Sequence, residues 1–191
     1  MTRFMPLLFF STLAWSSHLD NCLSLKPFIK EAFERYTTIS YWYGVAQAKK
    51  ESGCRWRKSL DGQGSIGYFQ LAPKFLDAYL RPLFPDYDKP YSKDHFYASA
   101  YYLRMLDGNY PVWVVFARYN GGNWVLKECK GIYDWSYCRA NCKRGYVCVL
   151  KENGVCMQYR FACDINYDYP VFIYKHGQKY REGNDKRGFW R

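Results

Sequence analysis

The sequence predicts a mainly helical protein that carries a cysteine-rich insertion. Five stretches place apolar residues at helical spacing next to proline, serine or glycine signals that start or end helices. Six of the eight cysteines lie between residues 129 and 163, where that spacing is lost. A length of 191 residues fits one domain with a small appendage and is enough to bury a core.

The first residues, MTRFMPLLFFSTLAWSSH, are typical of a secretory signal. Arg3 precedes an apolar run from Met5 to Trp15, and Ala14 and Ser16 are small residues at the spacing that a signal peptidase needs. We expect residues 1–16 to be a signal peptide, whose removal takes away Arg3 alone and lowers the net charge from +11 to +10. The alternative is an uncleaved anchor, although the apolar run is short for a bilayer span.

Two helices are expected before the second cysteine. Pro27 suits the first turn of a helix, where its missing N–H is not needed, and apolar residues follow at helical spacing up to Tyr36. A second apolar face begins at Ile39, and this helix ends at Gly53, just after Glu51.

Three more helices are expected after residues 54–91, a stretch rich in glycine, proline and aspartate that is typical of loops. Each has a start and a stop signal, and they run from Ser92 to Gly108, from Pro111 to Gly121 and, less clearly, from Pro170 to Gly177. The remaining residues, 178–191, form a basic tail that we expect to be mobile.

The cysteines predict disulfides. An even number of cysteines behind a signal sequence indicates an oxidising compartment, so we expect a periplasmic or secreted protein. The insertion, residues 127–163, would be stapled by these bonds and could contain short strands such as GYVCVL. The alternative is zinc, since Cys138 and Cys142 have ligand spacing, but no second close pair follows. The sequence does not choose among the possible cysteine pairings.

The composition is basic and aromatic, with a net charge of +11 and 21% aromatic residues. A positive surface attracts anions over a long range, so nucleic acid, anionic wall polymers and acidic membranes are all candidates. Sugars and bases both stack on aromatic rings. No recognisable nucleic-acid-binding motif is present, so we expect no nucleic acid partner.

The segment GQGSIG, residues 62–67, matches the G-x-G-x-x-G pattern of dinucleotide-binding turns. That turn needs a buried strand before the first glycine and a helix at the last. Here CRWRKSLD precedes the glycines and the chain then runs into Pro73, so neither condition is met. We expect these glycines to permit tight turns and a close approach of the backbone to a ligand.

Glu51 is the candidate for acid–base chemistry. It falls in the last turn of a helix, whose partial negative charge raises the pKa of a carboxyl, and nearby rings would add desolvation. A carboxylic acid that stays protonated near neutral pH can protonate the leaving oxygen of a glycosidic bond. The alternative is a surface glutamate paired with Lys49 or Lys50.

Four blocks of the sequence, with a weaker fifth at Tyr169, closely resemble the catalytic domain of bacterial lytic transglycosylases, which is related to goose-type lysozyme. In order they are AQAKKESG (46–53), GSIGYFQLAP (64–73), YASAYYLRML (97–106) and FARYNGG (116–122). The chain departs from the family at Tyr68 and Phe69, which stand in place of Leu-Met, and at Arg118 and Gly121, which stand in place of alanines.

This resemblance implies a lysozyme-like α+β fold, a helical bundle around a substrate cleft formed by residues 17–126 and 164–177. It also implies that Glu51 alone is the general acid and base. Glu51 would cleave the bond between N-acetylmuramic acid and N-acetylglucosamine and leave a 1,6-anhydro sugar. No second carboxylate is then needed, unlike in most glycosidases, and Asp61, Asp77 and Asp86 fall outside the matching blocks.

The resemblance further implies a set of residues that bind substrate or position Glu51: Ser52, Phe69, Gln70, Tyr119, Asn120 and Tyr169. It implies glycan strands of peptidoglycan as the partner, and therefore association with the cell wall. It also implies a monomer, and neither a metal nor an organic cofactor. Two alternatives stay open. One is a lysozyme that hydrolyses the same bond, and the other is a non-catalytic wall-binding or assembly component of a secretion, conjugation or phage-entry apparatus.

Overall fold

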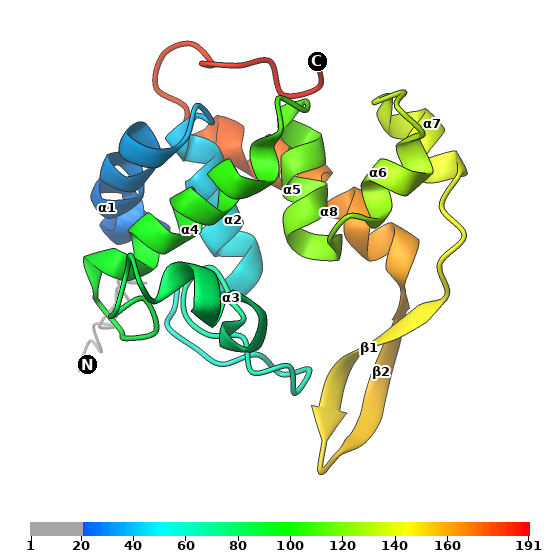
Figure 1. Cartoon of the computed structure of the whole chain (residues 1–191), viewed down its shortest axis with the longest axis horizontal. Coiled ribbons are helices and arrows are strands. Elements are labelled where there is room, and N and C mark those ends of the chain that lie inside the picture. The colour runs from blue at the N-terminus through cyan, green and yellow to red at the C-terminus, as the bar shows by residue number, and fades with distance from the viewer. Residues whose placement is uncertain (1–20) are drawn as a thin grey trace, which may run out of the picture.

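The computed structural model describes residues 21–191, which form eight α-helices, one two-stranded antiparallel sheet and a short 3-10 turn (Figure 1). The predicted mainly helical class is therefore confirmed. The expected signal peptide, residues 1–16, lies outside the described residues. In chain order the elements are α1 (Asn21–Tyr36), α2 (Tyr41–Ser52), α3 (Pro73–Leu80), α4 (Lys93–Asp107), α5 (Val112–Gly121), α6 (Trp124–Cys129), α7 (Trp135–Ala140), β1 (Tyr146–Glu152), β2 (Val155–Phe161) and α8 (Ala162–Gly177).

The helix α2 lies at the centre of the bundle. It packs against α1 on one side and α8 on the other, while α4 packs against α1 and α5, and α5 against α8. Every residue from Tyr41 to Ala48 is buried, as expected of a helix covered on all faces. The C-terminal turn of α2, which carries Glu51, is therefore held from several directions.

Local signals determine the end of α2 and both ends of α4 as predicted, while α2 begins at Tyr41, two residues after the expected Ile39. Gly53 adopts a left-handed conformation (φ 66°) and its N–H donates to the carbonyl of Lys49 at 3.0 Å, which ends α2. The hydroxyl of Ser92 accepts from the N–H of Asp94 at 3.2 Å, which caps α4. Its stop at Gly108 is also confirmed.

Two predicted starts and one predicted loop are wrong. The first helix begins at Asn21 and the last at Ala162, so Pro27 and Pro170 lie inside α1 and α8. Disulfides anchor the first turns of both helices, and this tertiary contact outweighs the cost of an internal proline. The expected loop also contains α3, which buries Leu76 and Leu80.

The disulfide prediction is confirmed, because all eight cysteines are paired. Cys22–Cys54 joins the start of α1 to the end of α2. The other three bonds staple the insertion, and they are Cys129–Cys138, Cys142–Cys163 and Cys148–Cys156. The cysteines therefore are not available as zinc thiolates. The segment GYVCVL does contain a strand, β1, which pairs with β2.

The expectation of a mobile tail at residues 178–191 is wrong. Phe189 is buried, and its carbonyl accepts a hydrogen bond from the N–H of Trp113 at 3.0 Å. Its ring lies 4.7 Å from that of Tyr43. The tail therefore fills part of the core beside α2. Within residues 21–191, no helix is both long and apolar enough to cross a bilayer.

Candidate active site

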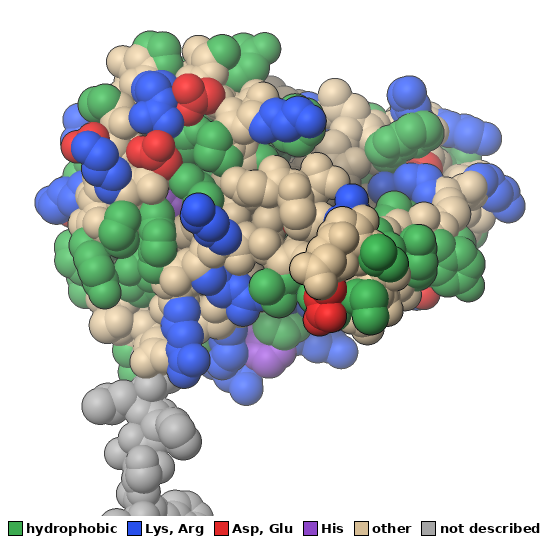
Figure 2. All heavy atoms as spheres, turned by 90° about the horizontal axis from the view of Figure 1, so that it is seen from below, with side chains coloured by type: hydrophobic (Ala, Val, Ile, Leu, Met, Phe, Trp, Pro, Cys, Tyr) green, Lys and Arg blue, Asp and Glu red, His purple; other side chains and the backbone are tan. Residues whose placement is uncertain are grey.

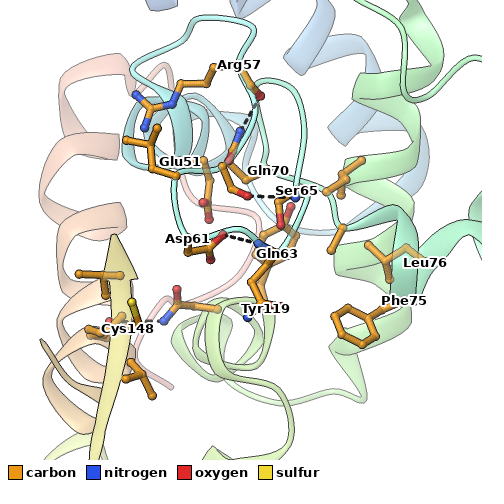
Figure 3. Close-up of a pocket in the computed structure, with 18 of the residues that line it drawn as sticks. Glu51, Arg57, Asp61, Gln63, Ser65, Gln70, Phe75, Leu76, Tyr119 and Cys148 are labelled. Carbon is orange, nitrogen blue, oxygen red and sulfur yellow. Dashed lines mark hydrogen bonds between the residues drawn. The ribbon is translucent and has the colours of Figure 1, made fainter. Parts of the chain in front are cut away.

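A cavity of about 580 Å³ opens beside the end of α2 (Figure 3). Its walls come from the loop that follows α2, from α3, from α5 and from the strand β1. A smaller cavity of about 130 Å³ adjoins it. The two cavities share four of their lining residues, namely Glu51, Asn120, Val149 and Ile165. Glu51 therefore stands where the two cavities meet.

The last turn of α2 places Glu51 at this junction. Beyond Gly53, the N–H of Cys54 donates to the carbonyl of Ala48 at 3.2 Å, which closes the helix end. The disulfide from Cys54 to Cys22 then ties this end to α1. Glu51 is thus fixed by the helix behind it and by a covalent bond three residues ahead.

Burial raises the pKa of Glu51 from its ordinary value of 4.5 to about 7. Two smaller influences act in the opposite direction, a hydrogen bond from the hydroxyl of Tyr169 and the positive charge of Lys50. The carboxyl is closely surrounded by protein, yet solvent reaches it through the cavity. It has the properties of a general acid, and burial is the main cause of its raised pKa rather than the helix end alone.

The loop along one side of the cavity is shaped by a buried histidine. Nε2 of His95 accepts from the N–H groups of Tyr68 (3.0 Å) and Phe69 (3.3 Å), and its Nδ1–H donates to the carbonyl of Tyr87 (2.7 Å). Burial lowers the pKa of His95 to about 4, so the ring is neutral at pH 7. Gly67 has φ +81°, and a Cβ there would lie 2.2 Å from the His95 ring. The glycine in this loop therefore permits a close approach to a side chain.

Gln70 lies on the cavity wall with a left-handed backbone (φ 51°). Its amide nitrogen donates to the carbonyls of Arg57 (3.0 Å) and Gly67 (2.8 Å). These two hydrogen bonds connect different parts of the same loop and hold them together. The amide oxygen is the remaining polar atom of the side chain, and it is suited to accept from a ligand hydroxyl or amide.

Tyr119 and Asn120 lie in the last turn of α5, and both line the cavity. Figure 3 shows the position of Tyr119. The hydroxyl of Tyr119 donates to the carbonyl of Phe69 at 2.7 Å, and burial raises its pKa well above 10. The amide nitrogen of Asn120 makes long contacts, to the carbonyl of Ile165 (3.4 Å) and to Oδ1 of Asn166 (3.5 Å). Both residues line the same cavity as Glu51, and the two contacts of the Asn120 amide are long for hydrogen bonds.

Ser52 and Phe69 lie behind the wall rather than on it. The Ser52 hydroxyl is buried within hydrogen-bonding distance of the carbonyls of Ala48 (3.0 Å) and Tyr68 (2.8 Å). The Phe69 ring is fully buried in the core beside Phe96. Their side chains therefore support the helix end and the loop, and only the backbone of Phe69 reaches the site, through Tyr119.

Asp61 also lines the cavity, although the sequence blocks gave it no role. Its Oδ1 accepts from the N–H of Gln63 at 2.9 Å, and Figure 3 draws its carboxyl and that of Glu51 on the same cavity. Asp77 and Asp86 do not share this position, since they pair with Arg81 and Lys89. The signal that could have pointed to Asp61 in the sequence was its position, as a polar residue between two of the matching blocks.

The strand β1 is the least expected part of the wall. Val147, Cys148 and Val149 line the cavity, although they lie almost one hundred residues from Glu51 in sequence. No helical or loop pattern near Glu51 signals this contact. Among residues 21–191, no group of three or more histidine, cysteine or acidic side chains is arranged to hold a metal ion.

No protein-family model matches this chain, and neither a curated protein nor a solved structure matches it.

Proposed function

We propose that this protein is a peptidoglycan lytic transglycosylase with a lysozyme-like fold, in which Glu51 is the single catalytic acid and base. The observation that carries the proposal is the Glu51 carboxyl, which opens into a cavity with its pKa raised to about 7. A group with this pKa can both donate and accept a proton near neutral pH. The resemblance of four sequence blocks to lytic transglycosylases supports the same assignment.

In the proposed reaction, protonated Glu51 donates its proton to the oxygen between N-acetylmuramic acid and N-acetylglucosamine. The bond from that oxygen to C1 of the muramoyl residue breaks, and the substrate's acetamido group stabilises the positive charge at C1. The Glu51 carboxylate then takes the proton of the muramoyl C6 hydroxyl as its oxygen attacks C1. The products are a 1,6-anhydro sugar and a free 4-hydroxyl, and Glu51 is protonated again.

Tyr169 supports the second half of this cycle. Its hydroxyl donates to Glu51, which favours the carboxylate and orients it. Gln70, Tyr119 and Asn120 line the same cavity and are proposed to bind the sugars. Ser52 and Phe69 are proposed as positioning residues, because their side chains hold the helix end and the loop.

Hydrolysis of the same bond is the second candidate. It is favoured by Asp61, a carboxylate on the cavity that Glu51 also lines. Inverting glycosidases use a second carboxylate to activate water. In that case Asp61→Asn would abolish cleavage, whereas the transglycosylase reaction would keep most of its rate, because C6 of the substrate supplies the nucleophile.

The proposed partner is an anionic wall polymer, and the proposed location is the periplasm or the cell exterior. Four disulfides are consistent with an oxidising compartment. Figure 2 shows many more Lys and Arg than Asp and Glu side chains on the face seen from below. Such a surface favours approach to anionic polymers at low salt.

The test is mass spectrometry of purified peptidoglycan treated with the protein, which is prepared under oxidising conditions. Anhydro-muropeptides from the unaltered protein, and none from Glu51→Gln, are expected. Glu34→Gln, on the exposed face of α1, is the matched control and should retain activity. Reducing-end products lost in Glu51→Gln would identify a hydrolase. Retention on the wall without release of sugar by the folded protein would contradict catalysis and favour the assembly role.

A further inference from the structure

The disulfide-stapled hairpin touches the loop on the opposite side of the cavity. The N–H of Lys151 in β1 donates to the carbonyl of Leu60 at 3.0 Å. Beside this bond, the side chain of Lys151 lies against Gly62, with its Cδ 3.6 Å from the position of a Cβ there. Figure 1 shows the same approach, where the loop before α3 reaches the hairpin. Two segments far apart in sequence thus meet across the site.

The hairpin is fixed at its base and along its length. Its base is tied to α8 by Cys142–Cys163 and by the N–H of Ala162, which donates to the carbonyl of Gly145 at 3.0 Å. Cys148–Cys156 joins its two strands. The outer edge of β1 has backbone groups that β2 does not pair, and Leu60 accepts from one of them. The hairpin, residues 146–161, is therefore held at its base and along one edge, and we call it the arm.

The arm passes beside the junction that holds Glu51. Val149 lines both the larger and the smaller cavity, as Glu51 does. The larger cavity extends toward the loop and α3, and the smaller one toward Lys50 and Asp168. A polymer strand that lies in both cavities would pass between Glu51 and the arm. The Lys151–Leu60 contact would then complete a closed ring of protein around the strand.

We propose that the hairpin and the loop close the cleft into a passage, so that the protein takes glycan strands by their ends rather than along their length. This inference rests on the proposed function for the identity of the polymer. A cleft that is open along one side can bind any internal stretch of a polymer. A closed passage admits a strand only when one of its ends is threaded through.

A binding experiment tests the ring without requiring catalysis. Peptide-free glycan strands are prepared in three forms: with free ends, with biotin and streptavidin on one end, and with streptavidin on both ends. Glu51→Gln is immobilised, and binding is followed by interferometry. Strands with at least one free end should bind, and doubly capped strands should bind about tenfold more weakly or not at all. Equal binding of all three forms would overturn the proposal.

Two further variants, each carried with Glu51→Gln, open the ring. Lys151→Pro removes the N–H that donates to Leu60. The second replaces residues 147–160 by Asn-Gly between Tyr146 and Phe161, which are paired in the sheet, and it removes Cys148 and Cys156 together. Doubly capped strands should then bind as well as free strands. If the folded second variant still discriminates against the doubly capped strands, the arm is not what closes the site.

Cleavage products separate this proposal from the proposed function. At low conversion, the unaltered protein should release short fragments from strand ends. The same two ring-opening changes, made with Glu51 left in place, should yield fragments of intermediate length. Intermediate fragments from the unaltered protein would overturn the passage while leaving the chemistry intact. If no bond is cleaved but only strands with a free end bind, the proposed reaction fails and the passage stands. If no form of the strand binds, the glycan passage is wrong.

Discussion

The hydroxyl of Tyr169 donates a hydrogen bond to the carboxyl of Glu51, although 118 residues separate the two in sequence. This bond opposes burial, which is the larger influence and raises the pKa of Glu51 to about 7. Replacing Tyr169 by phenylalanine removes the hydrogen bond that stabilises the carboxylate. We expect Tyr169→Phe to raise the pKa of Glu51 further and to shift the alkaline limb of the pH–rate profile to higher pH.

The matched control for this variant is Tyr167→Phe. The Tyr167 hydroxyl lies on the same helix and donates to another buried carboxylate, Glu128, at 2.6 Å. This change removes a buried hydroxyl without touching the cavity, so it should lower stability and leave the pH–rate profile in place. An unchanged profile in Tyr169→Phe would show that the hydrogen bond does not tune Glu51.

The raised pKa of Glu51 predicts how the rate depends on pH. A general acid must be protonated, and Glu51 is mostly protonated below about pH 7. Initial rates of anhydro-product formation should therefore fall above pH 7, by about tenfold for each further pH unit. If Glu51 were a surface glutamate, the rate would begin to fall near the ordinary pKa of 4.5. A limb at that lower value would contradict the proposed environment of Glu51.

His95 predicts a loss of stability in acid. Its pKa is about 4 in the folded protein against an ordinary value of 6.5, so the unfolded chain binds the proton more readily. The contribution of His95 is therefore complete above pH 6.5 and is lost as the pH falls toward 4. Its size is roughly 3 kcal/mol in the free energy of unfolding. Urea unfolding at several pH values measures it.

The control for the acid prediction is His95→Gln, which keeps a donor and an acceptor in the side chain but cannot gain a proton. The difference in unfolding free energy between the two proteins should narrow as the pH falls from 6.5 to 4. A constant difference would mean that His95 does not account for the acid sensitivity.

Gly67 predicts that the loop beside the cavity tolerates no side chain. An alanine there would combine a positive φ of 81° with a Cβ that overlaps the His95 ring. Gly131→Ala is the control, because Gly131 has a φ of 84° and nothing within 4 Å of a Cβ. We expect the control to cost about 1 kcal/mol and Gly67→Ala about 3 kcal/mol, with loss of cleavage. If Gly67→Ala and Gly131→Ala lose the same free energy of unfolding, the His95 ring can move aside.

Local signals in the sequence were sufficient for α2 and α4, and they placed Glu51 at a helix end. They failed where distant contacts decide the outcome. The disulfides at Cys22 and Cys163 extend two helices through prolines, and Phe189 draws the tail into the core. Most of the residues that line the larger cavity lie between positions 51 and 76, but the strand β1 reaches it from a distant insertion. Periodicity and turn signals carry no information on such a contact.

The four disulfides link the shape of the site to the chemistry of its surroundings. Cys22–Cys54 fixes the helix end behind Glu51, and Cys148–Cys156 joins the strands of the arm beside it. Both bonds form in oxidising compartments and are rare where thiols are kept reduced. A newly made chain in a reducing cytosol would lack both, so the proposed active site would mature only where the bonds can form. In this way, the cell that makes the protein would separate synthesis from activity without an inhibitor.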